Sequence, residues 1–109
     1  CIPNNLDQHP DHKAVTKHMK KAFKENKINN KIKILMYEVW GTLPLPNFYT
    51  DISDSIENKK EIINMYHSQI KHIDYAGKIT ALNEYRGMIA SKKSVEAYFI
   101  LSVEDFESI

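Results

Sequence analysis

The sequence contains little of the chemistry that marks disulfide-rich, membrane or nucleic-acid-binding proteins. Its 109 residues include one cysteine, one arginine and three glycines. The single cysteine, Cys1, excludes an intrachain disulfide and every cysteine-rich zinc pattern, and it favours a reducing, cytoplasmic location. No apolar run reaches the about 18 residues that a membrane span requires, and the start lacks a signal-peptide pattern. We therefore expect a cytoplasmic protein without a transmembrane segment.

The overall charge is close to neutral. Lys and Arg total 15 against 14 Asp and Glu, a formal charge of +1, so electrostatics give no reason to expect nucleic acid or an anionic membrane as the partner. The length suits one ordinary domain or a part of a larger one. Because the chain opens on "CIPNNLDQ" with no initiator Met, we expect it to be a piece of a longer protein.

The first half of the sequence predicts a helix, two strands and a proline-containing loop. A helix is expected over Pro10 to Asn26, ended by the "NKINNK" stretch, with one apolar face made by Ala14, Val15, Met19, Ala22 and Phe23. The β-branched and aromatic run from Lys31 to Trp40 is typical of a strand buried on both faces in a mostly parallel sheet. Its prolines make Gly41 to Asn47 a loop, and a short strand follows over Phe48 to Ser53.

The second half predicts two helices and a final strand. Ser53 or Asp54 can cap a helix to about His72, with an apolar stripe made by Ile56, Ile62, Ile63, Tyr66, Ile70 and Ile73. Asp74 can start a helix to about Ala90, in which one face holds Ile79, Leu82, Arg86 and Ile89. The run from Val95 to Val103 is expected to be a strand. The order helix, strand, strand, helix, helix, strand predicts an α/β fold.

The segment "LDQHPDHKAV", Leu6 to Val15, concentrates the candidate chemistry. Pro10 suits the first helical position, which puts His9 at the N-cap and His12 in the first turn. Imidazole and carboxylate are common ligands of hydrolytic zinc, and the positive end of a helix favours the neutral imidazole that a metal needs. One histidine could bind metal while the other polarises a carbonyl, with Asp11 orienting a ring through a hydrogen bond.

The same residues also suit a plain helix cap that faces water, since polar clusters of this kind are common at helix starts. The spacing of His9, Asp11 and His12 does not by itself decide between a cap and a metal site. The role of Arg86 is also open: its guanidinium could form buried structural hydrogen bonds, or it could bind the substrate.

Five segments in order resemble one enzyme family. "LDQHPDHKAV" looks like the second motif of the PIG-L/LmbE-like family of zinc-dependent N-acetylglucosamine deacetylases. "YEVWGTLPLPNFYTDIS" is similar to the family's strand, proline loop and strand, and "KKEIINMYHSQI" to its helix ending in Ser-Gln. "ALNEYRG" and "SVEAYFIL" resemble the family's closing Arg-Gly turn and last strand.

This resemblance implies a three-layer α/β/α Rossmann-like fold with a mostly parallel sheet, of which residues 1–109 are the C-terminal portion of a single deacetylase-like domain. It implies that His12 is a zinc ligand, that His9 stabilises or protonates the tetrahedral intermediate, and that Asp11 is the outer partner of His9. The family's first motif, Ala-His-Pro-Asp-Asp, supplies the other zinc ligands and the general base. It is absent from this sequence and is expected before Cys1, so the chain alone is expected to be inactive.

The sequence is consistent with three functions. The resemblance implies removal of acetate from an N-acetylglucosamine-containing conjugate, with zinc as the cofactor and the N-terminal part of the same domain as a partner. The oligomeric state is open, and a homo-oligomer is one alternative. The alternative is a non-catalytic α/β binding or assembly domain whose polar helix start is only a cap. A phosphoester hydrolase ranks last, because Lys13 is the one cation next to the motif in the sequence.

Overall fold

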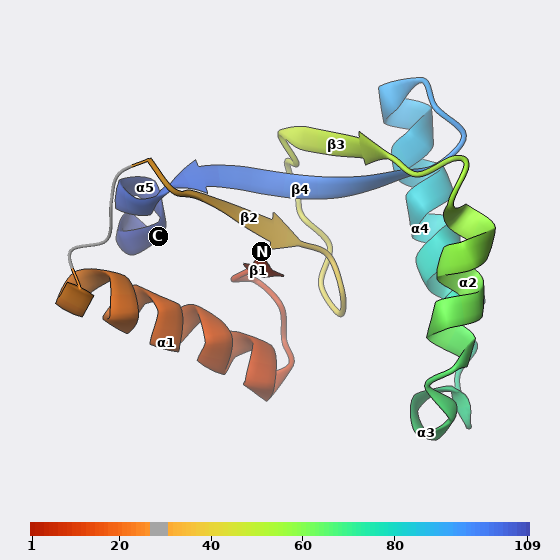
Figure 1. Cartoon of the computed structure of the whole chain (residues 1–109), viewed down its shortest axis with the longest axis horizontal. Helices are drawn as coiled ribbons and strands as arrows, with labels where there is room; N and C mark the ends of the chain where they lie inside the picture. Colours follow the sequence, from red (N-terminus) through yellow and green to blue (C-terminus); the bar gives the residue numbers. More distant parts are fainter. Residues whose placement is uncertain (27–30) are drawn as a thin grey trace. The chain divides into compact units, whose positions relative to one another are not determined.

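The computed structural model describes residues 1–26 and 31–109, which form two compact units (Figure 1). Unit 1 contains residues 1–48 and 97–109, and unit 2 contains residues 49–96. In chain order the elements are β1 (Ile2–Pro3), α1 (Pro10–Asn26), β2 (Lys33–Tyr37), β3 (Phe48–Asp51), α2 (Ile56–Asn64), α3 (His67–Ile70), α4 (Tyr75–Ala90), β4 (Val95–Ser102) and α5 (Val103–Ser108). The α/β class is confirmed, and the bounds expected for α1 are correct. Residues 27–30 of the expected helix-ending stretch lie outside the described residues.

The sheet is mixed and mostly antiparallel, with strand order β1-β2-β4-β3. β1 and β2 form a parallel pair in which Ile2 lies opposite Met36. β2 and β4 are antiparallel, in a register that pairs Lys33 with Ser102 and Tyr37 with Tyr98. The expectation of a mostly parallel sheet is therefore wrong, and the three-layer Rossmann-like arrangement stays a prediction.

The burial of β2 explains that error. Ile34 and Met36 are buried, whereas Leu35 and Tyr37 between them are only partly covered. Such alternation is typical of an antiparallel strand with one face in the core. The run from Lys31 to Trp40 is apolar enough to suggest burial on both faces, because large aliphatic and aromatic side chains also occupy the partly exposed positions.

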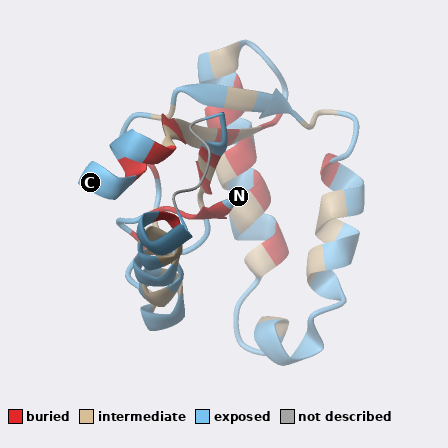
Figure 2. Ribbon diagram, turned by 60° about the vertical axis from the view of Figure 1, so that its left-hand side comes forward, coloured by how far each residue is buried: buried red, intermediate tan, exposed pale blue. Residues whose placement is uncertain are grey.

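The core of unit 1 lies between the strands and the helices α1 and α5. α1 contacts β1 and α5, and α5 contacts β2. The rings of Phe23 and Phe106 meet edge to face at 5.9 Å between centroids, a favourable aromatic geometry. Figure 2 shows buried residues of this unit on its strands and on α5, while much of α1 is exposed. The cluster consists of Ile2, Phe23, Ile34, Met36, Leu43, Leu101, Val103 and Phe106.

In unit 2, α2 packs against α4. Asp74 caps α4 as expected, because its carboxylate accepts the N–H of Gly77 at 2.9 Å. The expected face of α4 is buried only in part, because Arg86 is buried, Ile79 and Leu82 are half-buried and Ile89 is exposed. The buried positions of the helix are Ala76, Thr80, Asn83, Arg86 and Gly87. This helix therefore buries small and polar side chains.

The single long helix expected up to His72 is also wrong. The chain forms α2 and then, after Met65 and Tyr66, the short helix α3. Ser55, rather than Ser53 or Asp54, occupies the N-cap of α2, and its side chain makes no capping hydrogen bond. On the expected apolar stripe, Ile62 and Tyr66 are exposed. The apolar residues recur with a helical period up to Ile73, but α2 ends at Asn64 and α3 is a separate short helix.

The expected Arg-Gly turn is part of α4. A Cβ on Gly87 would lie 2.6 Å from the carbonyl oxygen of Lys92, so this glycine permits the chain to return closely over the helix. The helix ends at Ala90, and the C-cap residue Ser91 has a φ of 55°. Within residues 1–26 and 31–109, no helix combines the length and the apolar composition needed to cross a membrane.

Candidate functional site

The candidate site lies in unit 1, where the chain enters α1. The carbonyl of His9 accepts the N–H of Lys13 at 3.1 Å, which places His9 at the N-cap as the sequence predicts. The N–H of His9 donates to Asp7 Oδ1 at 2.9 Å. The ring atom His9 Nδ1 in turn accepts the N–H of Asp11 at 3.3 Å. The backbone around the cap therefore fixes the direction of the His9 ring.

His12 lies beside His9. The two ring centroids are 4.8 Å apart and the ring planes are inclined by 37°. His12 Nδ1 is 2.9 Å from Asp7 Oδ2, a close polar contact that falls outside linear hydrogen-bond geometry. The side chain of His9 is 40% exposed and that of His12 is 21% exposed. Both rings are thus anchored at one side while part of each stays accessible.

Asp7 is the anchor of this site. Its side chain is fully buried, and its two oxygens accept the N–H groups of His9, at 2.9 Å, and Trp40, at 3.1 Å. Burial raises the pKa of Asp7, but these two N–H groups and the His12 ring outweigh it, and the pKa lies below its ordinary value. The carboxylate is therefore held ionised inside the protein.

A second buried side chain, Asn4, joins the loop after β2 to the start of α1. Its amide nitrogen donates to the carbonyl of Gly41 at 2.6 Å, and its side-chain oxygen accepts the N–H of Leu6 at 2.9 Å. A Cβ on Gly41 would lie 3.1 Å from Asp7 Cα. The backbone of the loop at Gly41 therefore packs closely against the backbone of Asp7.

Trp40 borders the histidines. Its ring lies nearly parallel to that of His9, with 6.4 Å between centroids and 19° between planes, and the residue is 52% exposed. The indole therefore adds an apolar surface next to the accessible part of the site.

The predicted residues are brought together only in part. His9, Asp11 and His12 share the start of α1, but the side chain of Asp11 is 90% exposed and its Oδ2 is 3.9 Å from His9 Nδ1. Sequence reasoning missed Asp7 and Asn4. An Asp two residues before an N-cap is a recognisable signal, since Asp side chains commonly accept the N–H two residues on. Such an Asp predicts a local turn, but it does not predict that Asp7 lies against His12.

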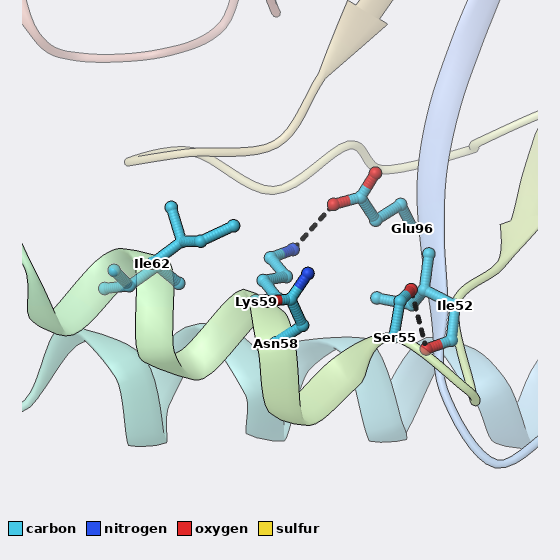
Figure 3. Close-up of a pocket in the computed structure, with 7 residues that line it drawn as sticks. Ile52, Ser55, Asn58, Lys59, Ile62 and Glu96 are labelled. Carbon is cyan, nitrogen blue, oxygen red and sulfur yellow. Dashed lines mark hydrogen bonds and ion pairs between the residues drawn. The ribbon is translucent and has the colours of Figure 1, made fainter.

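Arg86 belongs to unit 2, where it is a buried residue of α4. A groove of about 450 Å³ in the same unit is lined by Ile52, Ser55, Asn58, Lys59, Ile62, Ile63 and Glu96. Figure 3 shows the amine of Lys59 directed at the carboxylate of Glu96, with 2.7 Å between Nζ and Oε1. Lys59 Nζ also donates to Asn83 Oδ1 at 2.9 Å. The ammonium group of Lys59 is therefore bound by two side chains of unit 2.

The residues at the start of α1 suit one position of a zinc site. A ligating histidine commonly contacts a carboxylate through its second ring nitrogen, and Asp7 lies in that position relative to His12. A catalytic zinc site needs about three protein ligands. In the part of the chain that the structure describes, no group of three His, Cys, Asp or Glu side chains is placed to hold a metal ion.

Comparison with known proteins adds no assignment, since neither the protein-family models nor the curated proteins give a match to this sequence. The family resemblance therefore depends on the five quoted segments alone.

Proposed function

We propose that this chain is the C-terminal part of a zinc-dependent deacetylase that hydrolyses the N-acetyl amide of an N-acetylglucosamine-containing compound. Water cleaves the amide carbon–nitrogen bond, and the products are acetate and the free amine. In this proposal His12 contributes one zinc ligand and His9 acts on the reacting carbonyl. The remaining zinc ligands and the general base come from polypeptide outside this chain.

One observation carries the proposal: two partly exposed imidazoles lie 4.8 Å apart at the start of α1, and one of them contacts a buried carboxylate. A surface cap does not need a buried acid, because burying an ionised group is costly unless it is hydrogen-bonded. Here that cost is offset by two backbone N–H groups and the His12 ring. The arrangement supports a site in which a histidine must be held in place.

The roles of the residues follow from their positions. When bound, zinc would supply Lewis acidity to the amide carbonyl. His9, whose Nδ1 accepts the N–H of Asp11, is proposed to donate a hydrogen bond from its other ring nitrogen to the developing oxyanion. Trp40 extends the site with an apolar face beside His9. Asp11, at 3.9 Å from His9, is proposed to act through its charge on that ring.

The test uses the complete protein that contains this chain, with metal content and deacetylation measured together. We expect purified protein to contain zinc and to release acetate from an N-acetylglucosamine glycoside. His12→Ala should lower the zinc content and abolish turnover. His9→Ala should keep the zinc and lower kcat by about 100-fold or more, the usual contribution of an oxyanion donor.

His18→Ala is the matched control, because His18 lies on the exposed part of α1 outside the motif. It should leave zinc content and kcat unchanged. A complete protein that binds no zinc, or a His12→Ala variant with normal zinc content, would disprove the proposed function.

A second candidate is a non-catalytic binding or assembly domain, and a specific observation in unit 2 favours it. Large apolar side chains are exposed on and around α2 and α4, namely Ile62, Met65, Tyr66, Ile73, Tyr85, Met88 and Ile89. Exposed apolar side chains in such number are typical of surfaces that contact another polypeptide. Under this function, Tyr85→Ser with Met88→Ser should weaken assembly, whereas His9→Ala and His12→Ala should alter no activity of the complete protein.

A further inference from the structure

The two histidines of the site use the same ring atom, Nδ1, for opposite kinds of contact. His12 Nδ1 lies 2.9 Å from Asp7 Oδ2 in a contact that is short but not aligned as a hydrogen bond, so the polar atom nearest to it is an acceptor. His9 Nδ1 accepts the backbone N–H of Asp11 at 3.3 Å, so it faces a donor. A neutral imidazole has one protonated and one bare nitrogen, and the contact at one nitrogen determines the state of the other.

For His12, the acceptor is a fully buried carboxylate that also accepts the N–H groups of His9 and Trp40. A bare Nδ1 opposite this carboxylate would bring two lone pairs together in a site closed to water. Protonation of Nδ1 removes that repulsion. The neutral His12 ring then has its lone pair on Nε2.

For His9, the donor is a backbone N–H, which cannot be exchanged for an acceptor. Protonation of Nδ1 would place two hydrogens against each other and leave the amide of Asp11 unpaired in the first turn of α1. The neutral ring of His9 therefore keeps Nδ1 bare and has its proton on Nε2. Its exposed edge is a donor.

We infer that the two histidines are held in opposite neutral tautomers, His12 with a bare Nε2 and His9 with a protonated Nε2, and that Asp7 is the positioning residue for His12. The site then offers an electron pair and a hydrogen-bond donor on rings 4.8 Å apart. This pair suits a ligand that combines an electrophile with a nearby oxyanion, such as a metal ion and a polarised carbonyl. The link to zinc and the acetamide rests on the proposed function, whereas the tautomers do not.

The experiment is nitrogen-15 NMR of the imidazoles in this 109-residue chain, recorded well above the ordinary histidine pKa of about 6.5 and without metal. Two-bond and three-bond correlations to the ring carbon protons distinguish the bare nitrogen from the protonated one. We expect His12 to show the Nδ1–H pattern and His9 the Nε2–H pattern. The reverse assignment for His12 in the unaltered chain overturns the inference with no variant needed.

Asp7→Asn then tests the role of the carboxylate, since it removes the charge with little change in shape. We expect the His12 ring to shift toward the Nε2–H tautomer while the His9 pattern is retained. Asp11→Asn is the matched control, because it removes the same charge from a side chain that is 90% exposed. It should leave both patterns unchanged. Backbone amide spectra of each variant verify that the fold is retained.

The outcomes separate this inference from the proposed function. A His12 tautomer that does not respond to Asp7→Asn in a folded chain disproves the role of Asp7. A complete protein without zinc, together with the expected tautomers here, disproves the deacetylase and leaves the inference intact. If Asp7→Asn does not fold, the tautomers of the unaltered chain still decide whether His12 is protonated on Nδ1.

Discussion

The two units differ in the main kind of side chain that they bury. Unit 1 is built on an apolar cluster in which Met36 and Phe106 are fully buried. In unit 2 the buried face of α4 holds Thr80, Asn83 and Arg86. Apolar burial stabilises in proportion to the area removed from water and needs no specific partner, whereas buried polar groups stabilise only when each has one. The units therefore depend on different interactions.

This difference has a consequence for the candidate site. The buried carboxylate of Asp7 lies in the unit with the apolar core, where it accepts the backbone N–H groups of His9 and Trp40. A well-packed support holds a polar group in one geometry more firmly than a mobile surface does. In unit 2, buried polar side chains are part of the packing, beside the apolar Ile56, Ala76 and Val95. The polar side chains of unit 2 therefore serve mainly to stabilise its fold.

The largest effect that tests this comparison is expected at Phe106. Phe106→Ala removes a fully buried ring that contacts Phe23, and it should lower the free energy of unfolding by about 3–5 kcal/mol. Denaturant unfolding measures the change. Phe48→Ala is the control, since Phe48 is 42% exposed and should cost about 1 kcal/mol or less. Equal costs at the two positions would show that the apolar cluster is not the main support of unit 1.

The sequence predicts elements well where one local signal dominates. α1 has the expected bounds because its apolar period, Pro10 and the polar residues before it agree. Asp74 and the end of α4 at Ala90 are likewise predicted. α5 was missed, although Ser102 accepts the N–H of Asp105 at 3.0 Å in a capping pattern that is visible in "SVED".

Sheet direction and burial were predicted poorly, because both depend on residues far apart in the chain. β2 pairs with β4, which follows three intervening helices and returns in the opposite direction, and no local pattern in β2 encodes that. β1 contains two residues and gives no period to detect. The buried face of α4 only partly follows its apolar pattern, because Asn83 is buried where it accepts a hydrogen bond from Lys59 of α2.

The same reasoning applies to the site. The position of His9 at the N-cap and of His12 in the first turn follows from local sequence, and both are confirmed. The contact of Trp40 with Asp7 joins residues 33 positions apart. Only the fold reveals which aspartate lies against His12, since Asp7 and Asp11 are both close to it in sequence.

An intermediate effect is expected at the polar packing of unit 2. Lys59 Nζ lies 2.7 Å from Glu96 Oε1, and both side chains are partly buried at 25% and 33% exposed. A double-mutant cycle with Lys59→Met and Glu96→Gln should give a coupling free energy of about 1 kcal/mol, above the value for exposed pairs. Unfolding in denaturant at low and high salt measures it.

The matched control is the ion pair of Lys60 with Glu57 on the same helix, at 3.0 Å, in which Glu57 is 74% exposed. Its cycle with Lys60→Met and Glu57→Gln should give about 0.2–0.5 kcal/mol and be weakened by salt. A coupling at Lys59 no larger than this would mean that unit 2 does not depend on its buried polar pair.

The smallest effect is expected at Asp51, an exposed residue of β3. The hydroxyl of Ser53 at 2.6 Å and its N–H at 3.0 Å lower the pKa of Asp51, and Lys92 contributes less. Because this pKa is lower in the folded than in the unfolded chain, the associated stability is present above the ordinary value of about 3.9 and is lost as pH falls through the folded pKa. Ser53→Ala should raise the pKa of Asp51 in an NMR titration, and Lys92→Gln should raise it less. The reverse order would show that charge, rather than the hydroxyl, holds this carboxylate ionised, and that even the exposed polar groups of unit 2 act through ion pairs.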